Sequence, residues 1–108
     1  MNIVEITNQE EFWKLFNEDK PLLIDFYAEW CAPCKSLSPV FEELSRIYNE
    51  NLTVVKVDIE ANPEIAQKFM VRSIPTVVTS KSGEIEKGVV GAKPANFYKQ
   101  MAEEVINS

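Results

Sequence analysis

Cys31 and Cys34 are the residues of this chain best suited to chemistry. They are separated by Ala32 and Pro33 at the start of a segment whose apolar residues recur at helical spacing. Residues three apart on a helix lie on the same side, and one turn places two Cα atoms within the separation that a disulfide needs, about 4.4 to 6.8 Å. Pro33 is tolerated there because an amide in the first turn has no intrahelical acceptor. The spacing therefore predicts that the two sulfurs can form an intramolecular disulfide.

The two thiols are expected to differ in reactivity. Cys31 is expected at the N-terminus of the helix, where unpaired amide N–H groups and the helix dipole stabilise a thiolate. Cys34 follows one turn later beside the apolar stripe, so we expect it to be more buried and protonated. This asymmetry predicts that Cys31 is the attacking thiol and Cys34 the resolving thiol.

The composition excludes several other kinds of site. The 108 residues include 11 Lys plus Arg, 17 Asp plus Glu, two Cys and no His, and the formal net charge is −6. Without His, the chain cannot form a Cys–His nucleophile pair or a His-ligated metal site. Two thiols are only half of a tetrahedral zinc site, so a metal clip would need a second subunit. The acidic balance argues against a nucleic-acid partner, because binding to phosphates depends on Lys and Arg.

Length and hydropathy indicate a soluble protein. A chain of 108 residues suits one domain, since domains usually have roughly 100 to 200 residues, and no linker or repeat divides residues 1–108. The N-terminus, Met1 to Glu5, lacks the basic start and apolar run of a signal peptide. The longest apolar runs have only a few residues, far short of the ~20 that span a bilayer. We therefore expect a single-domain, cytoplasmic monomer that does not bind membranes.

Hydrophobic periodicity predicts strands and helices in the order βαβαβαββα. Strands are expected at 2–6, 22–27, 52–58, 76–79 and 85–90, and helices at 9–18, from the cysteines to 48, at 63–69 and at 94–106. The run Leu22 to Tyr27 is apolar except for Asp25, as in a strand buried on both faces of a sheet. Gly83 marks the turn of a closing hairpin. The expected fold class is α/β, with a central mixed five-stranded sheet flanked by four helices.

The residues around the cysteines resemble the active site of the thioredoxin family. The motif is Trp30-Cys31-Ala32-Pro33-Cys34-Lys35, and the family usually has Gly where this chain has Ala32. Further matches follow in the family's order over nearly the whole chain: Asp25 at a buried acid, Pro39 at a helix-kinking proline, Lys56 at a lysine beside the acid, Ile74-Pro75-Thr76 at the cis-proline loop, Gly83 at the hairpin turn and Gly91-Ala92 at the late glycine. The resemblance implies the thioredoxin fold and the reduction of protein disulfides by thiol–disulfide exchange.

The resemblance also implies roles for residues outside the cysteine pair. Asp25, through a water, would exchange the proton of Cys34. Its burial would raise the pKa of the carboxyl group, and Lys56 would oppose that rise. The backbone of Ile74 would accept an extended substrate as an added strand. The docking groove would consist of Trp30, Ala32, Pro33, Ser73, Ile74, Pro75, Val90, Gly91 and Ala92.

The expected partners are disulfide-containing proteins and a separate thioredoxin reductase. The chain has no Gly-X-Gly-X-X-Gly stretch that would indicate a bound nicotinamide or flavin. We therefore expect no bound cofactor and a supply of electrons from the reductase.

Other interpretations remain open from the sequence. An oxidant or isomerase would use the same chemistry, although relatives with those functions generally carry His between the cysteines. A binding module would use the groove irrespective of redox state. Strand alternation places Lys56 on the same face as Val54 and Asp58, and this face could be solvated. Pro75 could be an ordinary trans proline, and Trp30 could serve packing only.

The sequence departs from the family pattern at three places. Ala32 adds a methyl group beside the cysteines, so the redox potential can differ from the family norm. Tyr27 stands where many thioredoxins carry Trp. Thr79-Ser80 replaces a more apolar strand end, which predicts weaker packing under the hairpin.

Overall fold

The elements follow one another in the predicted order. The computed structural model describes residues 2–108. The strands are β1 (Ile3–Glu5), β2 (Leu22–Tyr27), β3 (Thr53–Asp58), β4 (Thr76–Lys81) and β5 (Glu84–Val90). The helices are α1 (Gln9–Asn17), α2 (Ala32–Ile47), α3 (Pro63–Lys68) and α4 (Ala95–Ile106). Their ends lie within two residues of the predicted ones, and Pro39 lies inside α2 as expected.

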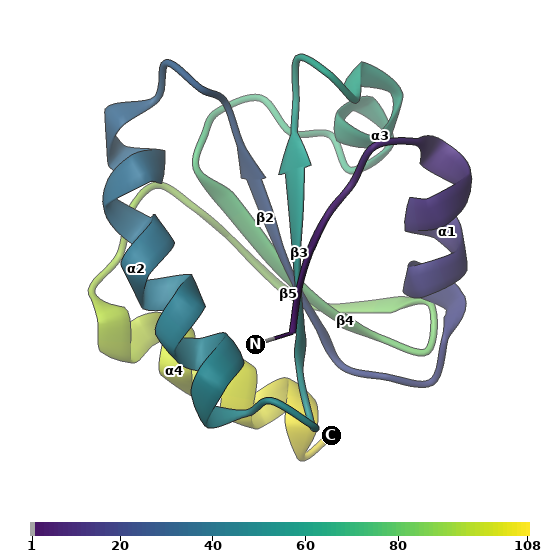
Figure 1. Ribbon diagram of the computed structural model, residues 1–108, viewed down its shortest axis with the longest axis vertical. Coiled ribbons are helices and arrows are strands. Elements are labelled where there is room, and N and C mark those ends of the chain that lie inside the picture. The colour runs from purple at the N-terminus through teal and green to yellow at the C-terminus, as the bar shows by residue number, and fades with distance from the viewer. Residues whose placement is uncertain (1) are drawn as a thin grey trace.

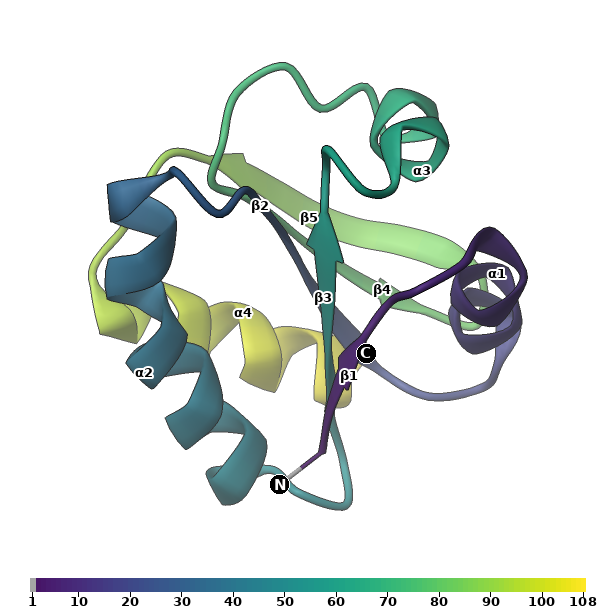
Figure 2. The same ribbon diagram turned by 45° about the horizontal axis from the view of Figure 1, so that its top comes forward.

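The five strands form one mixed sheet in the order β1-β3-β2-β4-β5 (Figure 1). The pairs β1–β3 and β3–β2 are parallel, and the pairs β2–β4 and β4–β5 are antiparallel. Helices α2 and α4 cover one face of the sheet, and α1 and α3 cover the other (Figures 1 and 2). The predicted fold class, a mixed five-stranded sheet with four helices, is confirmed.

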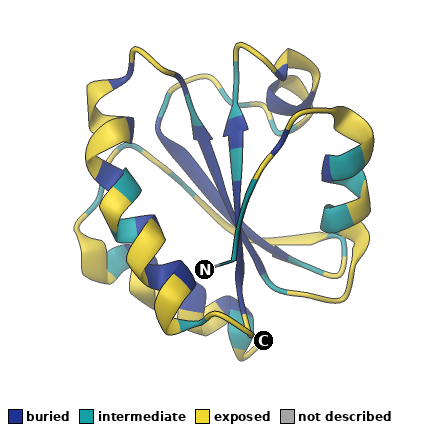
Figure 3. Ribbon diagram, in the orientation of Figure 1, coloured by how far each residue is buried: buried dark blue, intermediate teal, exposed yellow. Residues whose placement is uncertain are grey.

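The core consists of two apolar layers, one on each face of the sheet. Alternation along β2 sends Leu23 into the layer under α2 and α4, and Leu22 and Ile24 into the layer under α1 and α3. Figure 3 shows the resulting pattern, with buried central strands and exposed outer faces of the helices. Phe12 and Phe41 are buried in these layers, and Phe16, Phe69 and Phe97 are half-buried against them.

The polar end of β4 is buried. Thr79 and Ser80 are both inaccessible to solvent, and the Ser80 hydroxyl has no hydrogen-bond partner among residues 2–108. An unpaired buried hydroxyl costs stability. The sequence departure at Thr79-Ser80 therefore places polar groups in the core rather than at its margin.

Candidate functional site

Cys31 and Cys34 form a disulfide at the N-terminus of α2, as their spacing predicts. Their Cα atoms are 5.3 Å apart. Cys31 is the N-cap residue of α2, and its Sγ accepts a hydrogen bond from the Cys34 backbone N–H at 3.2 Å. Pro33 lies in the first turn, where its missing N–H leaves no gap in the helix. The sequence thus builds the disulfide without interrupting α2.

The expected difference in burial between the two cysteines is wrong for the disulfide state. Cys31 is 3% exposed and Cys34 is 4% exposed. The bridge holds both sulfurs within one turn, where Ala28 packs against them and Ile74 partly covers them. What distinguishes the cysteines is position: Cys31 caps the helix, where the dipole favours a negative sulfur, and Cys34 lies inside the first turn.

Asp25 is a buried acid in the central strand β2. Its side chain is 1% exposed, and neither carboxyl oxygen has a hydrogen-bond partner among residues 2–108. Burial raises the pKa of Asp25 from 3.8 to about 7, while the positive charge of Lys56 lowers it and the negative charge of Glu5 raises it. Asp25 can therefore take up or release a proton close to neutral pH.

Lys56 is the neighbour of Asp25 on the adjacent strand. The two residues are register partners between β2 and β3. Lys56 is half-buried, and its Nζ lies 4.6 Å from the centroid of the Tyr27 ring. Lys56 is therefore partly covered, with its ammonium over an aromatic ring and its backbone paired with that of a buried acid.

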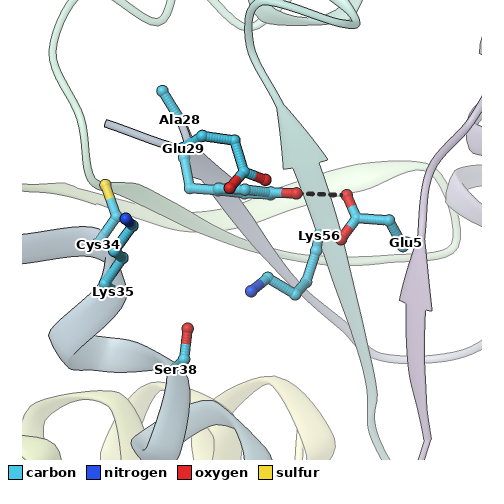
Figure 4. A pocket seen from close by; sticks show the side chains of 8 residues that line it. Glu5, Ala28, Glu29, Cys34, Lys35, Ser38 and Lys56 are labelled. Carbon is cyan, nitrogen blue, oxygen red and sulfur yellow. Dashed lines mark hydrogen bonds between the residues drawn. The ribbon is translucent and has the colours of Figure 1, made fainter. Parts of the chain in front are cut away.

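A pocket of about 210 Å³ opens between Lys56 and Cys34 (Figure 4). Cys34 lies on one side of this pocket and Glu5 on the other, with Lys56 between them. The Tyr27 hydroxyl donates a hydrogen bond of 2.7 Å to Glu5 Oε2. The residues that line the pocket are Glu5, Tyr27, Ala28, Glu29, Cys34, Lys35, Ser38 and Lys56. Cys34 therefore borders a pocket that is lined mostly by polar side chains.

Sequence reasoning missed Glu5. Strand alternation places Glu5 on the same face as Ile3, but it does not reveal that β1 pairs with β3 and so brings Glu5 beside Lys56. The available signal was the Tyr27 hydroxyl, which needs a polar partner where many thioredoxins have Trp.

Two loops meet beside the disulfide. The Ile74–Pro75 peptide bond is cis, as the resemblance implies, and Ile74 packs against the cysteines. The Pro75 carbonyl accepts a hydrogen bond of 2.8 Å from the Gly91 N–H, which ties the second loop to the first. Gly91 has φ +89°, a conformation that favours glycine.

Most of the predicted groove residues are accessible. Trp30 is 66% exposed, and its Nε1 donates a hydrogen bond of 2.9 Å to Glu60 Oε2. Exposed residues also include Ala32, Pro33, Ser73, Val90 and Ala92; Ile74 and Gly91 are half-buried, and Pro75 is buried. The Trp30 ring is thus held by its polar edge while its apolar surface stays open.

The chain is similar in sequence to known proteins. The family model described as Thioredoxin matches residues 3–104. The chain belongs to the thioredoxin family. Thioredoxin of Mycobacterium bovis is 39% identical over 105 residues, which are 96% of this chain and 90% of that protein. The bifunctional thioredoxin reductase/thioredoxin of Mycobacterium leprae is 43% identical over 105 residues, 96% of this chain and 23% of that protein.

The fold agrees with solved thioredoxins. The structure of Plasmodium falciparum thioredoxin matches with a TM-score of 0.87 at 33% identity, over 94% of this chain and 97% of that one. A thioredoxin-family chain with a Cys31–Cys34 disulfide is a thiol–disulfide oxidoreductase of the protein-disulfide reductase type. A binding module that works irrespective of redox state is not favoured. Within residues 2–108, every helix is too short or too polar to cross a membrane.

Proposed function

We propose that this thioredoxin-family chain reduces disulfides in other proteins with Cys31 as the nucleophile and Cys34 as the resolving thiol. The observation that carries the assignment is the hydrogen bond of 3.2 Å from the Cys34 backbone N–H to the Cys31 Sγ at the N-cap of α2. After reduction, this amide and the helix dipole favour the thiolate of Cys31 over that of Cys34.

The reaction consists of two exchange steps. The Cys31 thiolate attacks one sulfur of the target disulfide, so a mixed disulfide forms and the other target sulfur leaves as a thiolate. Cys34 then loses its proton and attacks Cys31 Sγ, which forms the Cys31–Cys34 bridge and releases the first target sulfur. Two electrons pass from this chain to the target, whose two sulfurs leave as thiols after taking up protons.

Asp25 is proposed to receive the proton of Cys34 through a water. Two observations support this role: the pKa of the Asp25 carboxyl group is about 7, and Asp25 lies in the strand that leads into the cysteine motif. The pocket beside Cys34 offers room for such a water, and Lys56 at its wall moderates the basicity of Asp25.

Substrates are proposed to dock as extended segments along the backbone of Ile74, beside Ser73 and Pro75. The second wall would be formed by Val90, Gly91 and Ala92, and the rim by Trp30, Ala32 and Pro33. The support is the exposure of most of these residues and the hydrogen bond that joins the loops at Pro75 and Gly91. Backbone pairing of this kind tolerates many substrate sequences.

A separate thioredoxin reductase is proposed to return the chain to the dithiol state, with no cofactor bound to the chain itself. The support is the Mycobacterium leprae relative, whose name joins both proteins in one polypeptide. We further propose that residues 1–108 act as one domain, as a monomer and in the cytoplasm, where thiols are kept reduced. Light scattering after size-exclusion chromatography tests the monomer.

Insulin reduction tests the function. We expect turnover with the native chain and a thioredoxin reductase, and loss of it in Cys31→Ser. Cys34→Ser should accumulate a covalent adduct with the target that mass spectrometry detects, whereas Cys31→Ser should not. Full activity of Cys31→Ser would refute the mechanism, and an adduct formed only by Cys31→Ser would reverse the roles of the two cysteines.

A further inference from the structure

Three charged residues lie in one row across the sheet. Glu5 in β1 is the register partner of Lys56 in β3, and Lys56 is the register partner of Asp25 in β2. Residues paired in this way across parallel strands project from the same face, here the face under α2 and α4, to which the neighbouring Leu23 also belongs. A basic residue therefore stands between two acidic residues in the sheet.

The carboxylate of Glu5 is held in place by Tyr27. The Tyr27 hydroxyl donates to Glu5 Oε2 at 2.7 Å, while Lys56 Nζ lies 4.6 Å from the centroid of the same ring (Figure 4). Burial, and then the hydrogen bond to Glu5, raise the pKa of Tyr27, so its hydroxyl keeps the proton that it donates. Tyr27 thus binds a carboxylate by its edge and an ammonium by its face.

The single positive charge of Lys56 acts on both Asp25 and Glu5. Asp25 lacks a hydrogen-bond partner among residues 2–108, so the positive charge of Lys56 is what favours its ionised form. Glu5 attracts the same ammonium and also repels the ionised form of Asp25. Both effects favour the protonated form of Asp25.

Among residues 2–108, the charges that shift the pKa of Asp25 are those of Lys56 and Glu5. Tyr98 of α4 is a buried phenol held by Lys93 N–H and the Gly91 carbonyl, and burial raises its pKa. From β4, the register partner of Asp25 is the apolar Val77. From α2, Cys34 lines the same pocket as Lys56. Glu29 and Lys35, which also line this pocket, carry opposite charges. Asp58 of β3 is the register partner of Tyr27, two residues after the pair of Lys56 and Asp25.

We infer that Glu5 is a positioning residue for thiol–disulfide exchange: held by Tyr27, it competes with Asp25 for the Lys56 ammonium and so sets the pH at which Asp25 exchanges the proton of Cys34. The inference rests on the proposed role of Asp25. Glu5 touches neither the cysteines nor the substrate groove; it acts on Asp25 through Lys56 and, to a smaller extent, by direct repulsion between the two carboxylates.

The direct test is Glu5→Gln, which keeps the side chain's size and removes its charge. We expect the titration midpoint of the Asp25 carboxyl, followed by carbon-13 NMR in the disulfide form, to fall by about half a pH unit. The pH profile of mixed-disulfide resolution should move by the same amount. Glu10→Gln is the matched control, because it makes the same charge change at an exposed site on α1, across the sheet.

A double-mutant cycle tests whether Glu5 acts through Lys56. In a Lys56→Met background, Glu5→Gln should shift the Asp25 titration by less than half as much as in the native background. Tyr27→Phe keeps both charges and releases Glu5, so it should shift the midpoint in the same direction by a smaller amount.

Two results would overturn the inference. One is a shift in Glu5→Gln no larger than in Glu10→Gln, and the other is an equal shift with and without Lys56. The NMR titration needs no turnover, so it is read separately from the insulin assay. Loss of the proposed function in that assay and loss of this inference are therefore distinguishable.

Discussion

Asp25 and Lys56 are register partners on adjacent parallel strands, yet the Lys56 ammonium lies over the Tyr27 ring and the Asp25 carboxyl has no hydrogen-bond partner among residues 2–108. A fully paired carboxylate would have a low pKa, whereas burial holds the pKa of Asp25 at about 7. The arrangement leaves the acid able to change its protonation near neutral pH.

Asp25→Asn should slow resolution of the mixed disulfide more than its formation. An amide cannot accept the Cys34 proton, and loss of a general base costs typically about a hundredfold or more. Acid quenching followed by mass spectrometry measures the mixed disulfide against time. The first step is isolated in a Cys34→Ser background, where Asp25→Asn should leave the rate of adduct formation nearly unchanged. Equal rates of resolution with Asp and Asn would disprove the proton-transfer role.

The buried Asp25 should also make the disulfide form less stable as pH rises. Its pKa is raised from 3.8 to about 7 on folding, so between these values the native state holds a proton that the unfolded state has lost. Stability from this group is complete below about pH 4, falls as pH rises and is lost above about pH 7, by at most about 4 kcal/mol. Urea unfolding should therefore show Asp25→Asn to be more stable than the native chain at about pH 8, with little difference at about pH 4. A native advantage at the higher pH would contradict this sign.

Much of this site follows from local sequence. The run Leu22 to Tyr27 predicts the bounds of β2, because an apolar run this short favours a buried strand over a helix. The N-cap position of Cys31 follows from Pro33 and the apolar stripe after it. Both features depend on residues that are close together in the sequence.

Other features depend on partners far along the chain. The alignment of Glu5 with Lys56 arises from the register of β1 on β3, which no local pattern encodes. The equal burial of the two cysteines depends on closure of the disulfide and on Ile74 from a distant loop. Met70 adopts φ 57° without being glycine, so a turn signal based on glycine misses it.

Ser45→Ala should stabilise the fold. Ser45 is buried within α2, and its hydroxyl has no hydrogen-bond partner among residues 2–108. Removing an unpaired buried hydroxyl and replacing Ser by a better helix former should add about 1 kcal/mol to the free energy of unfolding. Chemical denaturation measures this difference, with Ser36→Ala on the exposed side of α2 as the control. A destabilised Ser45→Ala would indicate a partner for the hydroxyl, such as a buried water.

Trp30→Ala should weaken substrate binding with little loss of stability. Trp30 is 66% exposed and is fixed by one hydrogen bond to Glu60, so its removal leaves no cavity in the core. Its open apolar surface beside the disulfide is suited to contact a docked segment, and its loss should raise the KM for insulin several-fold with a smaller effect on kcat. Ile47→Ala is the matched control, since Ile47 is 52% exposed at the other end of α2. Because both variants lose an exposed apolar side chain, a rise in KM shared by the two would assign the effect to general surface hydrophobicity. A rise confined to Trp30→Ala would support the groove.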